Sequence, residues 1–348
     1  MRIARKVRSL APYVYGEQPQ GRGVLKINTN ESPYLASPKI RQVLAKFDFE
    51  RLRRYPSADF KELRAELAHL HRTTVDRIFV GNGSDEILSL MTDAFVEDDE
   101  AICSLDPSYS LYNTLADIRG VRWIGLDGLD GLKKGKKVSL ALITSPNNPT
   151  GEQIPPKKIA AFAQRFPGVV VVDEAYVDYA DVNCMRFATA KGNRNVIVMR
   201  TFSKAYALAG LRVGYCVGPA DLIQALYKIK DSYNVDAIAQ AVALVAVRDQ
   251  RHLKGLVAKV RKTRARFVAA LEKRGWNVLP SQANFVFARP PCARTAKADA
   301  KRVFEGLRAR NIFIRYFPGP KTCDRVRISI GTDAQMARVL REIDAILR

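Results

Sequence analysis

A lysine lies between hydroxyl side chains and an arginine in a stretch that is otherwise apolar. Thr201, Ser203 and Lys204 are followed eight residues later by Arg212, within the segment TFSKAYALAGLR. Burial among apolar side chains lowers the pKa of a lysine amine and favours its neutral, nucleophilic form. Hydroxyls and an arginine are suited to bind a phosphate. The segment therefore suggests a Schiff-base enzyme that uses pyridoxal phosphate.

An aspartate ends one of the most apolar runs of the chain. Asp173 follows four consecutive valines, residues 169–172. A carboxylate there is costly unless it meets a cation, and the protonated pyridine nitrogen of the cofactor is such a cation. A helix N-cap is the alternative interpretation of the same residue.

Three more segments follow apolar runs and contain residues suited to binding. The turn GNGSDE places Ser84 and Asp85 at the start of a helix, where free N–H groups can hold a phosphate, although a simple N-cap would look the same. Tyr109 could lie flat on a planar cofactor or pack in the core. The segment SPNNPTG forms a rigid loop, and its Asn148 offers an oriented amide.

Short Val- and Ile-rich runs alternate with helical patterns through the first two thirds of the chain. This order predicts an α/β fold with a mainly parallel seven-stranded sheet sandwiched by helices. A long helical stretch from about 236 to 274 and an α+β pattern follow, which indicates a second, smaller domain. We expect an N-terminal arm at 1–34, a large domain at 35–248 and a small domain at 249–348. The expected strands of the large sheet are 78–80, 101–104, 121–124, 138–144, 169–173, 196–200 and 213–217.

Composition narrows the functional classes. The 348 residues carry 57 Lys and Arg against 35 Asp and Glu, a balance of +22 that is spread along the whole chain. This spread favours a basic surface over a nucleic-acid-binding module. The apolar runs are too short for a membrane span, and the N-terminus does not read as a secretory signal. The five scattered cysteines have no zinc spacing, so we expect no metal site and a cytoplasmic location.

Taken in order, these motifs resemble those of the fold-type I pyridoxal-phosphate aminotransferases. Within that group, the chain is most similar to the histidinol-phosphate aminotransferase family, from Pro12 onward. The similarity rests on the following segments: PY (12–13), NTNESP (28–33), RYP (54–56), GNGSDE (81–86), SPNNPTG (145–151), DEAY (173–176), TFSKAYALAGLRVGY (201–215), SQANF (281–285) and RISIGT (327–332).

The resemblance implies roles in cofactor binding. Lys204 would bind the cofactor covalently and then shuttle the proton at the substrate Cα. Asp173 would pair with the pyridine nitrogen, and Tyr109 would stack on the ring. The other matching residues would contact the phenolic oxygen (Asn148 and Tyr176) or the phosphate (Ser84, Asp85, Thr201, Ser203 and Arg212). Lys204, Asp173 and Tyr176 would form the catalytic group.

The resemblance also implies substrate contacts and a partner. Arg327 would bind the carboxylate of the glutamate half-reaction, whereas Arg315 and Tyr13 would hold a substrate phosphate. Asn148 would also contact the substrate. Tyr55 would reach the cofactor phosphate of a neighbouring subunit, which implies a homodimer.

The implied reaction transfers the amino group of histidinol phosphate to 2-oxoglutarate, a step of histidine biosynthesis. An aromatic amino-acid aminotransferase and a threonine-phosphate decarboxylase of the same family stay open as alternatives. Outside the enzyme class, a cofactor-binding transcription regulator would need a DNA-binding module ahead of the matching core. A basic nucleic-acid-binding protein would need binding that persists at physiological salt.

Overall fold

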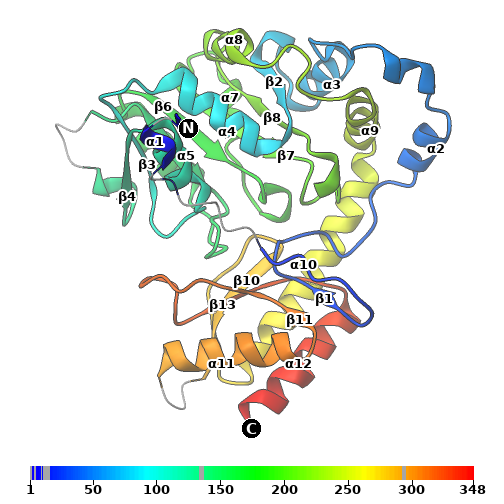
Figure 1. Ribbon diagram of the computed structural model, residues 1–348, viewed down its shortest axis with the longest axis vertical. Helices are drawn as coiled ribbons and strands as arrows, with labels where there is room; N and C mark the ends of the chain where they lie inside the picture. The colour runs from blue at the N-terminus through cyan, green and yellow to red at the C-terminus, as the bar shows by residue number, and fades with distance from the viewer. Residues whose placement is uncertain (1, 4, 9, 11–15, 133–136, 292–294) are drawn as a thin grey trace.

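The computed structural model describes residues 2–3, 5–8, 10, 16–132, 137–291 and 295–348 (Figure 1). Two sheets of different size organise these residues. The larger sheet lies in the first two thirds of the chain and the smaller one near the C-terminus. The Tyr13 position lies outside the described residues.

The larger sheet has seven strands in the order β2-β8-β7-β6-β5-β3-β4. β8 runs antiparallel to β2 and β7, and the other neighbours are parallel. Central strands such as β6 are buried at every position, as their continuous Val and Ile runs require in a sheet covered on both faces. The strands are β2 (Ile78–Gly81), β3 (Ala101–Leu105), β4 (Arg122–Leu126), β5 (Leu140–Thr144), β6 (Val169–Asp173), β7 (Val196–Thr201) and β8 (Gly214–Val217).

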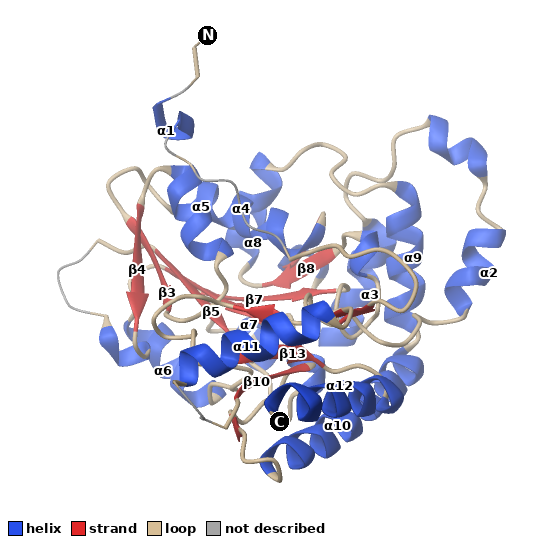
Figure 2. Ribbon diagram, turned by 60° about the horizontal axis from the view of Figure 1, so that its bottom comes forward, coloured by secondary structure: helices blue, strands red, loops and turns tan. Residues whose placement is uncertain are grey.

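Helices cover both faces of this sheet. On one face, α4 (Gly83–Phe95), α5 (Leu111–Arg119) and α8 (Ala220–Ile229) bury an apolar cluster against the strands (Figure 2). The other face packs against a second cluster that extends into the smaller sheet. The helices that contribute to this second cluster include α2 (Lys39–Ala45), α3 (Lys61–His71), α6 (Pro156–Arg165), α7 (Met185–Thr189) and α9 (Ala237–Arg248).

The smaller sheet has four antiparallel strands in the order β12-β13-β10-β9. A two-stranded parallel pair, β1 (Leu25–Lys26) with β11 (Ile312–Phe313), binds the N-terminal segment to this part of the molecule. The strands and helices here are β9 (Asn277–Val278), β10 (Phe285–Arg289), β12 (Arg315–Tyr316), β13 (Val326–Ser329), α10 (Gln250–Glu272), α11 (Ala296–Ala309) and α12 (Asp333–Leu347).

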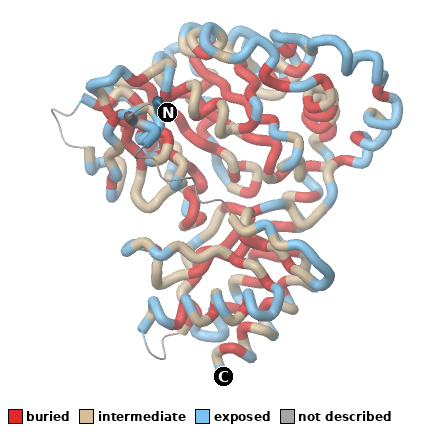
Figure 3. The backbone as a smooth tube through the Cα atoms, viewed as in Figure 1, coloured by how far each residue is buried: buried red, intermediate tan, exposed pale blue. Residues whose placement is uncertain are grey.

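Figure 3 shows that buried residues are concentrated in the strands and on the inward side of the helices. Among the described residues, no helix combines the length and apolar character that a membrane span needs. The remaining elements are short. They are α1 (Arg5–Arg8) and the 3-10 helices η1 (Phe49–Arg53), η2 (Val75–Arg77), η3 (Leu129–Gly131), η4 (Val177–Tyr179) and η5 (Ala209–Leu211).

All seven expected strands of the large sheet are present, with ends that shift by one or two residues. The prediction of one long helix at 236–274 is wrong, because the chain bends at Asp249 (φ −100°, ψ 56°) and forms two helices, α9 and α10. The Asp249 carboxylate accepts a hydrogen bond from Ser37 Oγ at 2.5 Å and lies 3.4 Å from Lys39 Nζ. These contacts hold the bend against the segment that leads into α2.

Candidate active site

A cavity of about 490 Å³ lies between the two sheets, at the carboxyl ends of β5, β6 and β7. Ligands of open α/β sheets bind at such strand ends. Twelve of the residues singled out in the sequence line it: Ser84, Asp85, Tyr109, Asn148, Asp173, Tyr176, Thr201, Ser203, Lys204, Arg212, Arg315 and Arg327. The fold therefore gathers residues that are up to 243 positions apart in the chain (327 − 84 = 243).

Lys204 follows β7 and points into this cavity. Its Nζ donates a hydrogen bond to the Thr29 backbone oxygen at 3.1 Å and lies 5.8 Å from the centre of the Tyr176 ring. Burial, with the nearby Arg327 guanidinium, lowers the pKa of the lysine from 10.5 to about 8. An amine with this pKa is a competent base and nucleophile near neutral pH.

Asp173 ends β6 on the floor of the cavity. Its Oδ1 accepts a hydrogen bond from the Ala175 backbone N–H at 3.0 Å, and its Oδ2 accepts one from the Tyr112 hydroxyl at 2.9 Å. Burial raises the pKa of the carboxyl group to about 6, against the opposing effect of these hydrogen bonds. Asp173 thus offers a buried carboxylate that a cationic ring nitrogen would stabilise.

Residues of the 201–203 segment and of the turn that begins α4 surround the Arg212 guanidinium. Ser203 Oγ accepts from Arg212 Nη1 at 3.4 Å, and Thr201 Oγ1 accepts from the Ser203 N–H at 3.1 Å. Arg212 also lies 3.3 Å from Asp85 Oδ2 at the start of α4. Gly83 has a φ of +81°, and a Cβ there would lie 2.6 Å from the Arg212 guanidinium. The turn needs glycine because the backbone approaches the arginine so closely.

Hydrogen bonds orient two further side chains of the cavity, the Asn148 amide and the Tyr176 phenol. Asn148 Oδ1 accepts from Arg327 Nη1 at 2.5 Å, so the amide nitrogen remains as the donor of this side chain. Tyr176 Oη accepts from Asn30 Nδ2 at 3.0 Å, which directs the phenolic hydrogen towards another acceptor. Both side chains line the cavity, and each therefore keeps a donor hydrogen that a ligand there could use.

Two arginines come from neighbouring strands of the smaller sheet. Arg315 on β12 and Arg327 on β13 are directly paired in the ladder, and both line the cavity. Arg327 is buried: its Nη2 donates to the Asn28 backbone oxygen at 2.6 Å, and its guanidinium lies 5.3 Å from the ring centres of Phe285 and Phe317. The pair supplies two positive charges to the cavity, which suit anionic groups of the substrates.

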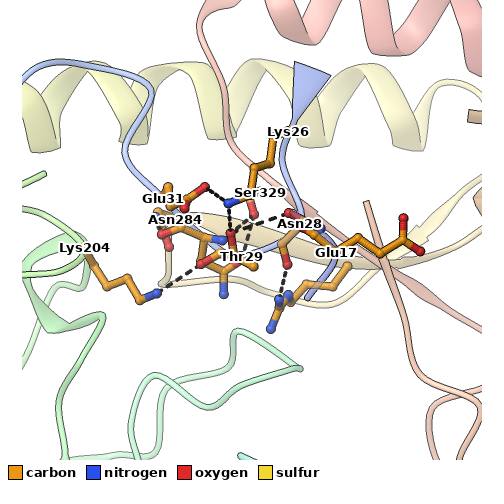
Figure 4. Close-up of polar contacts among 10 residues, drawn as sticks. Glu17, Lys26, Asn28, Thr29, Glu31, Lys204, Asn284 and Ser329 are labelled. Atoms are coloured by element: carbon orange, nitrogen blue, oxygen red, sulfur yellow. Dashed lines mark hydrogen bonds and ion pairs between the residues drawn. The ribbon is translucent and has the colours of Figure 1, made fainter. Parts of the chain in front are cut away.

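The motif NTNESP (28–33) had no predicted role, and its first four residues, 28–31, belong to the site. This segment contacts Lys204, which follows β7, through the Thr29 backbone oxygen, and Arg327 of β13 through the Asn28 backbone oxygen (Figure 4). The Asn30 side chain accepts from Ser329 Oγ at 2.8 Å, and its backbone oxygen accepts from Asn284 Nδ2 at 2.9 Å. Asn30 has a φ of +58°, a conformation that asparagine tolerates better than most residues. Asn28, Asn30, Asn284 and Ser329 all lie in motifs that the sequence analysis had singled out. Nothing in the sequence indicates that they lie together, which only the fold shows.

Tyr55 does not reach the cavity of its own chain. Its side chain is 80% exposed and stacks on Tyr233, with the ring centres 4.3 Å apart and the planes at 11°. Within the described residues no group of three or more His, Cys, Asp or Glu side chains is placed to hold a metal ion.

Comparison with known proteins agrees with this geometry. A family model described as aminotransferase class I and II matches residues 22–343. The chain belongs to the class I and II aminotransferases. It is therefore an enzyme, and the pyridoxal phosphate expected from the sequence is the cofactor of this family. The family resemblance and the fold class drawn from the motifs are both confirmed.

Two bacterial relatives of this aminotransferase match it over nearly their whole length. A histidinol-phosphate aminotransferase of Geobacter sp. (strain M21) is 41% identical over 347 residues, which cover 98% of this chain and 97% of the relative. Histidinol-phosphate aminotransferase 1 of Nostoc sp. (strain PCC 7120 / SAG 25.82 / UTEX 2576) is 39% identical over 348 residues, with 98% and 97% coverage.

Two solved structures share the fold. The histidinol-phosphate aminotransferase of Sinorhizobium meliloti, in complex with pyridoxal-5′-phosphate, aligns with a TM-score of 0.91 and 28% identity over 100% of this chain and 98% of that one. The L-threonine-O-3-phosphate decarboxylase of Porphyromonas gingivalis has a TM-score of 0.80 at 22% identity, over 93% and 99% of the two chains. At that identity the likeness concerns the fold alone.

Proposed function

We propose that this enzyme transfers the amino group of histidinol phosphate to 2-oxoglutarate and so forms imidazole acetol phosphate and glutamate, a step of histidine biosynthesis. The observation that carries the proposal is the placement of Arg315 and Arg327 side by side, opposite a lysine of lowered pKa. One arginine suits the acceptor's carboxylate and the other the donor's phosphate. The names of the relatives support the same substrate.

The residues around Lys204 fit pyridoxal phosphate. Arg212 with the Thr201 and Ser203 hydroxyls and the N-terminus of α4, which carries Ser84 and Asp85, would hold the phosphate. Asp173 would hold the ring nitrogen in its protonated form, and Tyr109 at the cavity wall would pack on the ring. Asn148 and Tyr176 would donate to the phenolic oxygen.

Bound pyridoxal phosphate supplies an electron-accepting ring that eases loss of the substrate's Cα proton. Lys204 Nζ takes up that proton, because burial keeps much of the amine neutral at a pH near 8. Arg327 orients the carboxylate of the acceptor, and Asn28 and Asn148 fix the guanidinium for this task. Arg315, with Tyr13, would hold the phosphate of the donor and leave its amino end facing Lys204.

The proposed enzyme is a homodimer in which Tyr55 reaches the cofactor phosphate of the second subunit. Tyr55 is exposed in its own chain and stacks on the exposed Tyr233. Leu35, Leu44, Phe49 and Leu52, earlier in the same stretch of chain, are exposed too, and exposed apolar side chains suit a protein interface.

Domain limits at 34/35 and 248/249 and a cytoplasmic location complete the proposal. The small domain would begin just before α10, whose first residue is Gln250, and would include the four-stranded sheet. The described cysteines are free, which suits a reducing compartment.

An assay with purified holoenzyme tests the reaction. Histidinol phosphate, threonine phosphate and phenylalanine are each supplied with 2-oxoglutarate, and glutamate and CO₂ are both measured. We expect glutamate formation with histidinol phosphate and no CO₂. Release of CO₂ from threonine phosphate would support the decarboxylase, and fast glutamate formation from phenylalanine alone would support the aromatic alternative.

A further inference from the structure

A tyrosine outside the cavity contacts the carboxylate on its floor. Tyr112 belongs to α5, its side chain is fully buried, and it does not line the cavity. Its hydroxyl lies 2.9 Å from Asp173 Oδ2 and 2.6 Å from Thr144 Oγ1. The ring meets that of Tyr109 edge to face, at 5.6 Å and 80°. Tyr112 therefore connects the cavity floor to the helix behind it.

The number of hydrogens on Asp173, Tyr112 and Thr144 decides which group donates in each of their hydrogen bonds. An ionised carboxylate only accepts, so the single hydrogen of the Tyr112 hydroxyl goes to Asp173. Thr144 must then donate to the Tyr112 oxygen. With the Ala175 N–H on the other carboxylate oxygen, both oxygens of Asp173 are held by donors from opposite sides. This arrangement fixes both the rotation of the carboxylate and its charge.

We propose that Tyr112 is a positioning residue of the transamination, whose hydroxyl, ordered by Thr144, holds Asp173 ionised and aimed at the ring nitrogen of the cofactor. The inference rests on the proposed function, because it needs Asp173 to pair with that nitrogen. The Tyr112 hydroxyl would act through Asp173, because it bonds to that carboxylate and Tyr112 itself does not line the cavity. The contact between the Tyr112 and Tyr109 rings does not involve the hydroxyl, so it is kept in Tyr112→Phe.

The charged and titratable groups around Asp173 give the expected pH effect. Tyr112 comes from α5, Asp85 from α4, Lys204 from the segment after β7, and Tyr176 from the segment after β6. Burial raises the pKa of Asp173, and the Tyr112 hydrogen bond is the largest opposing effect. Without that hydroxyl the carboxyl pKa rises further, so the carboxylate becomes protonated at a higher pH.

The test uses Tyr112→Phe and the affinity of the cofactor-free enzyme for pyridoxamine phosphate, which cannot bond covalently to Lys204. We expect binding at neutral pH to weaken about tenfold, as for the loss of a hydrogen bond to a charged group. The loss of binding on the acid side should move to higher pH. Tyr227→Phe is the matched control: its hydroxyl donates to the Ile78 backbone oxygen at 3.3 Å, outside the cavity lining, and its affinity should stay unchanged.

Thr144→Val provides a second variant that leaves the tyrosine in place. Thr144 also lines the cavity and lies 3.3 Å from Ser108 Oγ, so the pH dependence of binding is the informative readout for this variant. Pyridoxamine phosphate binding should weaken less than in Tyr112→Phe, by about threefold, and its loss on the acid side should again move to higher pH, because the donor that orders the Tyr112 hydroxyl is lost. If Tyr112→Phe fails to fold, a Thr144→Val enzyme with wild-type affinity and wild-type pH dependence would overturn the inference.

A double-mutant cycle separates this inference from the proposed function. Asp173→Asn alone should weaken binding strongly, and adding Tyr112→Phe to it should cost much less than in the wild type. Wild-type affinity in Asp173→Asn would overturn the role of Asp173 and with it the inference. A strong effect of Asp173→Asn with wild-type binding and pH dependence in Tyr112→Phe would overturn the inference alone.

Discussion

The two walls of the cavity hold their charged groups in different ways. On the wall formed by the large sheet, Asp173 ends the buried strand β6 and Lys204 follows β7 by three residues. Asp173 accepts from the Ala175 N–H, two residues on, and from the Tyr112 hydroxyl, 61 positions away. On the opposite wall, the Arg327 guanidinium depends on Asn28 and Asn148, which lie 299 and 179 positions away in the chain.

This difference assigns separate tasks to the two walls. Strand ends in a close-packed sheet have little freedom, so they suit a cofactor whose position must not change. The arginine wall belongs to another sheet. It is joined to the first wall by the 28–31 segment and by the hydrogen bond from Arg327 to Asn148. We infer that the large sheet sets the chemistry and the small sheet sets the substrate.

Replacing Lys204 on the first wall should have the largest effect. Lys204→Ala removes the base at the substrate Cα, so kcat should fall at least about 1,000-fold. Steady-state glutamate formation measures this, and the fold of the variant is checked by circular dichroism. Activity within tenfold of the wild type would mean that another group moves the proton.

Replacing Arg327 on the second wall should affect the acceptor. Arg327→Gln removes a buried charge for the carboxylate, so kcat/KM for 2-oxoglutarate should fall about 100-fold. Arg325→Gln is the control, because that guanidinium contacts Asn277 and does not line the cavity. An equal loss in both variants would show a structural effect.

Replacing Arg315 should separate the substrates. Arg315→Gln should lower kcat/KM for histidinol phosphate about 30-fold and leave that for glutamate within threefold, because of these two amino donors only histidinol phosphate carries a phosphate. Half-reactions with each amino donor give the two values. Equal losses for both donors would remove the distinction between the two arginines.

The smallest effect concerns stability. In the cofactor-free enzyme, Lys204 has a folded-state pKa of about 8, below its ordinary value of 10.5. Between these values the unfolded state binds more protons, so the free energy of unfolding should rise with pH, by up to about 1.4 kcal/mol per pH unit. Urea unfolding of the wild type and of Lys204→Met gives the two free energies of unfolding. Their difference should change with pH only between about pH 8 and pH 10.5. A constant difference would argue against a perturbed Lys204.

Local patterns predicted which residues of the large-sheet side line the cavity. Asp173, Lys204 and Arg212 lie in segments whose apolar neighbours and glycines already indicate a strand end or a turn. The large sheet could be predicted for the same reason, because Val-rich runs such as 169–172 define buried strands without tertiary information.

Contacts between distant segments could not be predicted in this way. Nothing near Asn30 indicates that Ser329 and Asn284 would hold it, and nothing near Tyr112 distinguishes it from a core tyrosine. The break at Asp249 was also hidden, since it depends on Ser37, which is 212 residues away. Chain topology decides these contacts, and one sequence carries little signal for them.

The most direct test of the division between the walls is a single-turnover experiment with wild-type holoenzyme and one donor at a time. Histidinol phosphate, glutamate and phenylalanine are mixed separately with the enzyme, and conversion of the cofactor is followed by its absorbance. We expect fast conversion with histidinol phosphate and with glutamate, and conversion about 100-fold slower with phenylalanine, which lacks a phosphate for the arginine wall. Faster conversion with phenylalanine than with histidinol phosphate would contradict the assignment.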